Sequence, residues 1–292
     1  MRWGDAMALV GVTGASGKLG DGVVDRLRKV IPPGHIVAVV RSPEKAERLV
    51  ARGVRVRGGD YAAPQTLAST FVGVKRLLFV SGNELGKRVD QHRAVIEAAK
   101  EAGVELIAYT SVLRADTSTL PIANEHQATE ELLRGSGVPW VILRNGWYIE
   151  NYTDSLRGPL ALGAFLGAAR EGRIAAASRS DYAAAAVTVL TTDAHQGKTY
   201  ELAGDYAFTK KQLAEAVSAW AGTSVGYHDL PAAEYRAALI KAGFPESTVT
   251  LLVETDLAIA RGDLDSSCRD LHRLIGHATT TLRDVLVSMS TP

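Results

Sequence analysis

The strongest constraint on the fold of this chain is a glycine-rich loop near its start. Glycines stand at positions 14, 17 and 20, directly after a short apolar run. Glycine accepts backbone angles that other residues avoid, lets a pyrophosphate approach the backbone, and lets a helix pack tightly on its strand. The N–H groups at a helix start also bind anions. The loop predicts a dinucleotide-binding turn, with an ordinary structural turn as the alternative. The expected contact residues are Gly11, Thr13, Gly14, Ala15, Ser16, Gly17, Lys18, Leu19 and Gly20.

Apolar runs and helical patterns alternate through the first half of the chain. Strands are expected at residues 7–13, 35–40, 54–56, 77–80, 105–109 and 140–143, and helices at 17–30, 43–52, 64–71, 86–102 and 121–134. Strands that are apolar on both faces and separated by helices require a parallel sheet covered on two sides. With right-handed crossovers, the pattern predicts an α/β fold: a doubly wound parallel sheet of the NAD(P)-binding Rossmann type.

The regular alternation fades after Asn151. Helical patterns recur at 181–191, 209–221, 232–242, 246–261 and 281–289, with short strands at 198–203 and 225–229. We expect residues 7–150 to form the cofactor-binding domain. Residues 151–292 would form a smaller mixed α/β lobe that binds substrate, with strand 198–203 returning to the main sheet. Residues 1–6 are expected to be a dispensable extension.

Composition narrows the class of protein. A net charge of +1 without a long run of one sign argues against nucleic-acid binding. The single cysteine, Cys268, rules out an internal disulfide framework and fits a reducing compartment. We see neither a signal peptide nor an apolar run long enough to span a membrane, so a cytoplasmic protein is expected. His228, His272 and His277 lack the spacing of metal ligands, so no metal is expected.

The residue after the second strand distinguishes the two nicotinamide cofactors. An NAD site usually places Asp or Glu there, to accept from the ribose 2′-hydroxyl. Here Arg41 follows the strand, no acid occurs before Glu44, and Lys45 lies one helical turn further on. A guanidinium suits a phosphate, and one such contact gives roughly ten- to a hundredfold in affinity. We therefore expect NADPH, the alternative being a solvated basic residue at a strand end.

Polar residues follow the next two strands, where parallel sheets bind ligands. Asp60 and Tyr61 follow the third strand and are expected beside adenine. Ser81 and Gly82, followed by Asn83, are expected beside the ribose and pyrophosphate. Helix caps or turns are the alternative, because Asp, Ser and Asn are favoured there.

Aromatic residues follow the end of the sixth strand. Trp147, Tyr148 and Tyr152 would form the walls of a site for a flat acceptor, while Asn145 and Gly146 would meet the nicotinamide carboxamide. Core packing between the lobes is the alternative.

A proton donor is harder to assign. The Tyr-x-x-x-Lys pair that many short-chain dehydrogenases use is missing from the helix after the fifth strand. His126 faces inward from that helix, and Glu130, one turn on, could orient it. Tyr148 could instead steady a developing oxyanion. His92 lies on an apolar stripe and is interpreted as a packing or interface residue.

Taken together, these motifs resemble the NmrA-like branch of atypical short-chain dehydrogenases. The resemblance rests on the Gly14–Gly20 loop, residues 38–46, 59–61, 107–111 and 143–148, and on later segments at 181–186, 200–204 and 274–277. It is greatest toward the bacterial NADPH:quinone oxidoreductases of this branch and weaker toward triphenylmethane reductases. It implies flavin-free, NADPH-dependent reduction of quinones by a homo-oligomer, with NADPH held by the glycine loop, Arg41, Ser81 and the Arg144–Tyr148 segment. That family also lacks the Tyr-x-x-x-Lys pair.

Two other functions stay open at this point. Some members of the branch bind NADP as redox sensors without turnover, and a fold does not fix a function. Another conjugated acceptor, such as a triphenylmethane dye, could replace the quinone.

Overall fold

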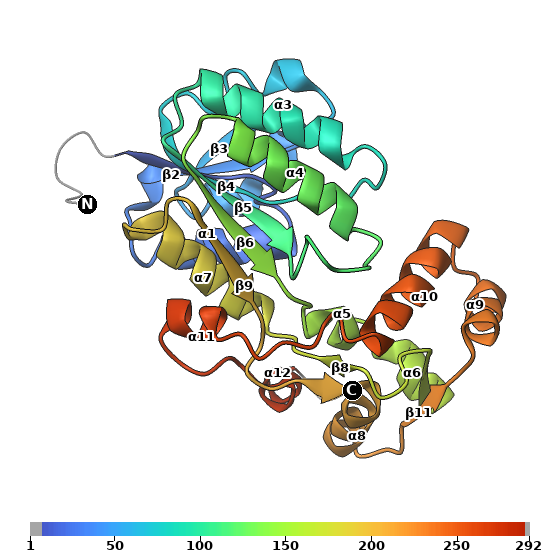
Figure 1. Cartoon of the computed structure of the whole chain (residues 1–292). Coiled ribbons are helices and arrows are strands. Elements are labelled where there is room, and N and C mark those ends of the chain that lie inside the picture. The colour runs from blue at the N-terminus through green and yellow to red at the C-terminus, as the bar shows by residue number, and fades with distance from the viewer. Residues whose placement is uncertain (1–7, 290–292) are drawn as a thin grey trace. The chain divides into compact units, whose positions relative to one another are not determined.

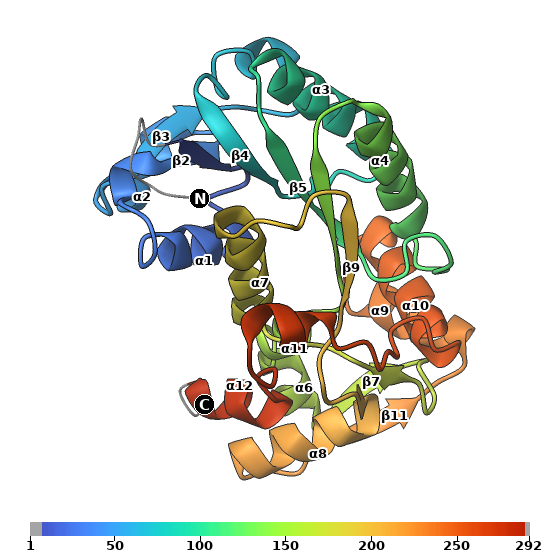
Figure 2. The ribbon, with the colours of Figure 1, turned by 60° about the vertical axis from the view of Figure 1, so that its left-hand side comes forward.

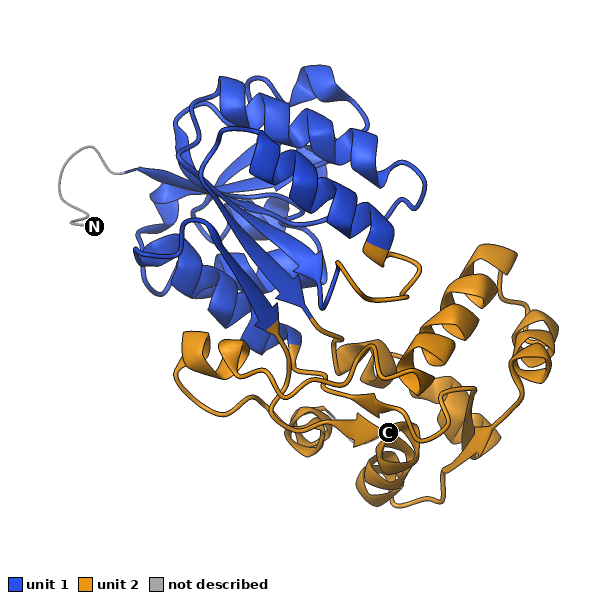
Figure 3. Cartoon of the chain, in the orientation of Figure 1, with its two compact units in different colours: residues 1–115, 124–145, 179–201 blue, residues 116–123, 146–178, 202–292 orange. Residues whose placement is uncertain are grey.

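We describe a computed structural model of the chain over residues 8–289 (Figure 1). The predicted N-terminal extension, residues 1–6, lies outside the described residues. Contacts divide the chain into two units, shown in blue and orange in Figure 3. Unit 1 contains residues 1–115, 124–145 and 179–201, and unit 2 contains residues 116–123, 146–178 and 202–292.

Within the described residues, unit 1 holds a seven-stranded sheet of order β3-β2-β1-β4-β5-β6-β9. The six strands from β3 to β6 pair in parallel, which confirms the predicted doubly wound Rossmann fold. The strands are β1 (Leu9–Val12), β2 (Ile36–Val40), β3 (Arg55–Gly58), β4 (Val74–Phe79), β5 (Leu106–Val112), β6 (Trp140–Asn145) and β9 (Lys198–Leu202).

Ligands of such sheets bind where the strand order reverses, and this point lies beside β1. From β1 the chain builds toward β2 and β3 on one side and toward β4 and β5 on the other. Val12, the last residue of β1, is in register with Ala38 and Leu78, so β1, β2 and β4 end at one edge of the sheet. The loops that leave these strands therefore converge.

Helices cover both faces of this sheet. The helices α1 and α7 pack on each other over one face, and α3 and α4 lie on the opposite face (Figure 2). Their bounds are α1 (Lys18–Leu27), α2 (Glu47–Val50), α3 (Arg88–Glu101), α4 (Ala123–Gly135) and α7 (Arg179–Thr191), with short 3₁₀ turns at Pro33–His35, Pro43–Lys45 and Pro64–Thr66. This double cover explains why the strands are apolar on both sides.

The predicted helix at residues 64–71 is wrong. A single 3₁₀ turn, Pro64–Thr66, is followed by further turns. The Thr66 hydroxyl donates to the Ala63 carbonyl at 2.7 Å, and the Thr70 hydroxyl donates to the Thr66 carbonyl at 2.7 Å. Threonine side chains that bond to nearby backbone compete with helix formation. The predicted helix at 43–52 is likewise split into a 3₁₀ turn and the short helix α2.

Unit 2 is a mixed α/β unit. Among the described residues it has two small sheets, with β8 (Arg173–Ile174) antiparallel to β10 (Phe208–Thr209) and β7 (Ala164–Gly167) parallel to β11 (Gly226–Asp229). Its helices are α5 (Glu150–Thr153), α6 (Arg157–Leu162), α8 (Lys210–Ala221), α9 (Ala232–Lys241), α10 (Glu246–Ala260), α11 (Asp270–Ile275) and α12 (Leu282–Ser288). Buried Tyr235, Val249 and Val253 belong to its core.

The predicted division at residue 150 stays a prediction. In the structure the two units are interleaved along the chain. After residues 146–178 of unit 2, the chain supplies α7 and β9 to unit 1 and then returns to unit 2. In the described part of the chain, none of the helices has the length and apolar character needed to cross a membrane.

Candidate nucleotide-binding site

The glycine loop connects β1 to α1 and leaves the start of the helix open. Gly14 has a φ of +59°, a left-handed conformation that favours glycine. The Gly17 N–H donates to the Gly14 carbonyl at 2.9 Å and closes the turn. Gly17 is also the N-cap of α1 and offers no capping side chain. The helix therefore presents its positive end to the loop, as an anion site requires.

Gly20 is required by packing. A Cβ atom at this position would lie 2.4 Å from the Gly14 carbonyl oxygen and 2.9 Å from the Ala15 Cα. Because both neighbours are backbone atoms, neither can rotate away. The third glycine of the motif thus lets α1 lie directly against the loop, as the spacing predicts.

A cavity of about 390 Å³ opens at this edge of the sheet, entirely within unit 1. It brings together residues from the loops after β1, β2, β3 and β4, which are far apart in sequence. Its lining contains Gly14, Ser16, Gly17, Val39, Arg41, Gly59, Asp60, Tyr61, Val80, Ser81, Gly82, Asn83, Glu84 and Gln91. Lys45 is exposed on the turn after β2 and is not part of this lining.

Arg41 stands at the carboxyl end of β2 with its side chain exposed at the cavity. Within residues 8–289 its guanidinium makes no hydrogen bond or ion pair. Its donors are therefore available to an anion. Asp60, by contrast, accepts from the Ala62 N–H at 3.0 Å and so shapes its own turn.

Tyr61 connects three segments beneath the cavity. Its hydroxyl donates to the Val80 carbonyl at 2.8 Å and also lies against the Thr13 hydroxyl. The Thr13 oxygen in turn accepts from the Val80 N–H at 2.9 Å. Burial raises the pKa of Tyr61 above its usual value, so the phenol stays neutral. The ring is held edge-on to Phe79, with 5.6 Å between centroids.

Arg144 is buried in an ion-pair network. Its Nε and Nη2 donate to the two carboxylate oxygens of Glu130 at 2.9 and 2.8 Å, and its Nη1 donates to Glu201 at 2.7 Å. Burial alone would lower the pKa of Arg144, but the two carboxylates outweigh it and raise that pKa. Glu130 also accepts from the Ser111 hydroxyl at 2.6 Å. Glu130 thus accepts hydrogen bonds from Arg144 and Ser111, whereas it was expected to orient His126.

His126 lies inside unit 1, on α4, and is nearly fully buried. Its Nδ1 is 2.7 Å from the Tyr109 hydroxyl. Burial, reinforced by the charge of Arg88, lowers the pKa of His126 to about 3, so the ring is neutral at physiological pH.

The aromatic residues predicted to bind substrate belong to unit 2. Trp147 and Tyr148 are half-buried and lie beside Ala177, which donates to the Trp147 carbonyl at 3.1 Å. The Tyr152 ring is edge-on to Phe208, with 6.1 Å between centroids, and burial raises the pKa of Tyr152.

The residues predicted to meet the carboxamide lie at the border of the two units in the sequence. Asn145 ends β6 in unit 1. Gly146 begins the next segment of unit 2, where its N–H donates to Leu202 at 2.7 Å.

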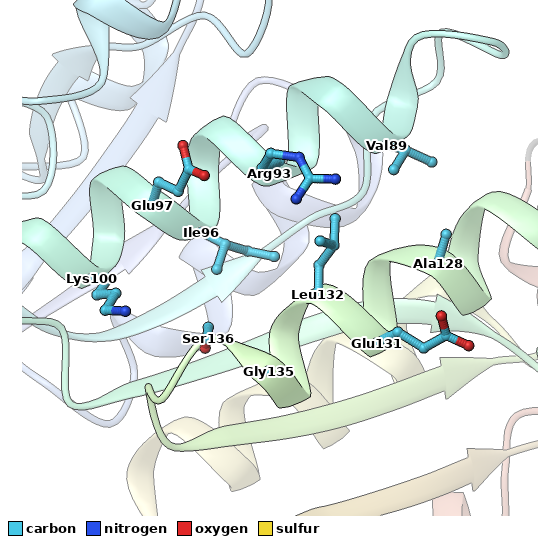
Figure 4. A pocket seen from close by; sticks show the side chains of 10 residues that line it. All are labelled: Val89, Arg93, Ile96, Glu97, Lys100, Ala128, Glu131, Leu132, Gly135 and Ser136. Carbon is cyan, nitrogen blue, oxygen red and sulfur yellow. The ribbon is translucent and has the colours of Figure 1, made fainter.

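A second cavity of unit 1, of about 540 Å³, lies between α3 and α4 (Figure 4). Ile96 of α3 and Leu132 of α4 face each other across it, and charged side chains such as Arg93 and Glu131 line it. It contains none of the predicted site residues. The described residues also hold no cluster of three or more potential metal ligands.

The fold and this site together define the class of protein. Residues 14–193 match the model of an NAD(P)H-binding family, and the chain belongs to that family. It is 47% identical over 276 residues to quinone oxidoreductase 2 of Escherichia coli K12, covering 94% of this chain and 96% of that protein.

Two solved structures have a fold similar to that of this chain. The NADPH complex of an Escherichia coli NADPH-dependent quinone oxidoreductase superposes with a TM-score of 0.92 at 46% identity, covering 96% of this chain and 99% of that one. The NADP(H) complex of a Citrobacter triphenylmethane reductase has a TM-score of 0.89 at 36% identity, with coverage of 96% and 99%. These matches confirm the family resemblance that the sequence motifs indicate.

Part of the cavity wall was not predicted from the sequence. Glu84 and Gln91 line the cavity, and His92, assigned to packing, bonds directly to the loop that forms the wall. The short spacing between Gly82 and the first turns of α3 could have indicated that side chains of this helix reach the loop.

Proposed function

We propose that this protein reduces quinones with NADPH, by two-electron hydride transfer and without flavin. The observation that carries this proposal is the cavity at the switch point of the sheet, with a free guanidinium at Arg41 where an NAD site would place a carboxylate. The 47% identity to quinone oxidoreductase 2 supports the choice of a quinone as acceptor.

The residues present fit NADPH. The left-handed turn at Gly14 and the close contact at Gly20 let the open end of α1 hold the pyrophosphate. Arg41, aided by Lys45, would bind the 2′-phosphate, and Tyr61 and Asp60 would flank the adenosine. The polar groups of Ser81 and Gly82 line the same cavity and suit the ribose and pyrophosphate.

The acceptor side is proposed on the Arg144–Tyr148 segment. Asn145 and Gly146 offer polar groups for the nicotinamide carboxamide, and Trp147, Tyr148 and Tyr152 offer flat walls for a quinone. Bound NADPH supplies the hydride. A quinone accepts hydride readily and its reduced anion is delocalised, so positioning supplies most of the rate.

Two residues are candidate proton donors or oxyanion stabilisers, Tyr148 and His126. His126 is neutral and its Nδ1 is hydrogen-bonded to Tyr109, so it is not a standing acid and would have to take up a proton before it could donate one. Substituting each separately tests these roles. Full turnover in both Tyr148→Phe and His126→Ala would exclude both residues as the essential donor.

The purified, flavin-free protein tests the whole proposal. NADPH oxidation, followed by the absorbance of the reduced nicotinamide, is expected to proceed steadily with simple quinones and more slowly with NADH. A panel of triphenylmethane dyes would reveal a different acceptor. Tight NADPH binding with no turnover on any quinone would contradict the enzyme assignment and favour a redox sensor.

We further propose that the protein acts in the cytoplasm as a homo-oligomer. The lone Cys268 supports a reducing compartment, and the family resemblance supports an assembly of identical subunits. Light scattering coupled to size-exclusion chromatography tests the second point, and a monomer at micromolar concentration would contradict it.

A further inference from the structure

The loop after β4 is held by side chains from the start of α3. The loop spans residues 80–87, and its residues 80–84 form one wall of the nucleotide cavity. The Gly82 N–H donates to His92 Nε2 at 2.9 Å, and the Gly82 carbonyl accepts from Arg88 Nε at 2.8 Å. His92 is fully buried and Arg88 is nearly so. Both polar groups of this residue are therefore bonded to interior side chains instead of water.

Both supporting side chains lead to one residue of α4. His92 Nδ1 lies 3.0 Å from the Thr129 hydroxyl, which donates to the Glu125 carbonyl at 2.8 Å. Arg88 Nη1 donates to Glu125 Oε2 at 2.6 Å. Glu125 Oε1 also accepts from the N–H of Gly86, at the far end of the same loop, at 2.7 Å. We call Arg88, His92, Glu125 and Thr129 the loop clamp.

The hydrogen bonds of the clamp run in one direction and require a neutral His92. Because the Gly82 N–H donates to Nε2, the ring proton must sit on Nδ1, where it donates to Thr129. Burial, together with His126 and Arg88, lowers the pKa of His92 to about 2, which keeps the ring neutral. A protonated ring could not accept from Gly82.

The wall has little freedom to shift while the clamp is intact. Hydrogen bonds hold it at two points, at both polar groups of Gly82 and at the N–H of Gly86. Gly86, with a φ of +82°, would otherwise give the loop many conformations. Ordering such a loop during binding lowers affinity, so a loop ordered in advance favours it.

We propose that the loop clamp is a positioning device for NADPH, with His92 as its central residue. This rests on the proposed function only in its choice of ligand. His92 acts through the Gly82 N–H, because its other hydrogen bonds run to the interior, to Thr129 of α4 at 3.0 Å and to Tyr109 of β5 at 3.5 Å. The clamp sets the affinity for the cofactor and leaves the hydride transfer itself unchanged.

His92→Phe tests this proposal because it keeps a ring and removes both hydrogen bonds. We expect the Kd and KM for NADPH to rise about tenfold, the effect of one buried N–H left without its acceptor. The kcat at saturating NADPH should stay within about twofold. His92→Gln can accept and donate again and should recover most of the affinity. Thr129→Val removes the next link and should raise the Kd about threefold, even if His92→Phe does not fold.

Val95→Ala is the matched control. Val95 lies three residues after His92 on α3, is fully buried in the core, and is not part of the cavity lining. We expect this substitution to lower the melting temperature without changing the Kd for NADPH. An unchanged Kd in both His92→Phe and Thr129→Val, or an equal rise in Val95→Ala, would overturn the clamp. The Kd is measured by titration without a quinone, so a failure of quinone reduction would leave this result standing.

Discussion

The Arg144 guanidinium is held by both carboxylate oxygens of Glu130, at 2.9 and 2.8 Å, and the Glu130 side chain is wholly buried. This pair fixes the end of β6, from which the Asn145–Tyr148 segment continues. The positive charge of Arg144 is thus neutralised inside unit 1. Its contribution to a cofactor site would come through the segment that it anchors, while Arg41 supplies the free positive charge.

Breaking this pair should destabilise the protein strongly. Glu130→Gln leaves the buried Arg144 without one of its counter-charges, and such losses cost about 3–5 kcal/mol. The control is Glu105→Gln, which removes the exposed ion pair with Lys75 and should cost less than about 1 kcal/mol. Urea unfolding of both variants measures the difference. Equal free energies of unfolding for the two would contradict the assignment of a structural role to Glu130.

Gly20→Ala should weaken NADPH binding. The added Cβ would lie 2.4 Å from the Gly14 carbonyl oxygen, so the phosphate loop must move away from α1. Overpacking of this kind costs about 1–3 kcal/mol, which corresponds to roughly 5- to 150-fold in Kd when the cost falls on the bound state. Gly34→Ala is the control, because nothing lies within 4 Å of a Cβ there. Calorimetric titration with NADPH distinguishes them, and unchanged binding by Gly20→Ala would refute the predicted contact.

Arg41→Ala should reduce discrimination between the two nicotinamide cofactors. Loss of a charge-assisted bond to the 2′-phosphate is expected to raise the KM for NADPH roughly ten- to a hundredfold. The KM for NADH should change little, because NADH has no phosphate there. Arg48→Ala, an exposed arginine of α2, is the matched control. A similar loss with both cofactors would show that Arg41 acts on the fold and not on the phosphate.

Acid should destabilise the folded state through two buried histidines. The pKa is lowered to about 3 at His126 and about 2 at His92, so both rings are neutral when folded but take up protons on unfolding below about pH 6.5. The unfolded state then binds more protons, and stability falls as pH falls from about 6.5 toward 3.

This loss amounts to about 2 kcal/mol for each histidine between pH 7 and pH 5. Urea unfolding at pH 7 and at pH 5 should show this fall in the free energy of unfolding. In His126→Phe the fall should be smaller by about 2 kcal/mol. His228→Asn, at an exposed histidine, is the control. A His126→Phe variant with the pH dependence of the wild type would contradict a buried neutral His126.

The doubly wound parallel sheet could be predicted because the alternation of apolar strands and helices is local in sequence. The glycine spacing fixes the turn after β1, and Arg41 must lie at the cavity because it follows a strand of the same parallel sheet. The prediction of a helix at residues 64–71 failed because two threonine hydroxyls compete for nearby backbone carbonyls, which apolar periodicity does not reveal.

Partners joined across the fold could not be predicted from the sequence. Glu130 lies one helical turn from His126, yet it bonds to Arg144 of the neighbouring strand β6. Similarly, His92 lies on an apolar stripe, which predicts packing and does not indicate that its Nε2 accepts from the Gly82 N–H. In both cases helical spacing gives the direction of a side chain, while the distance between elements decides its partner.

Direct hydride transfer from NADPH to a quinone is best tested by a single-turnover reaction. Protein saturated with NADPH, shown to be free of flavin, is mixed with excess quinone while loss of the reduced nicotinamide and formation of hydroquinone are followed together. We predict one hydroquinone formed for each NADPH oxidised, at matching rates, with no added cofactor. NADPH that stays bound and reduced in the presence of excess quinone would show that this protein is not a quinone reductase.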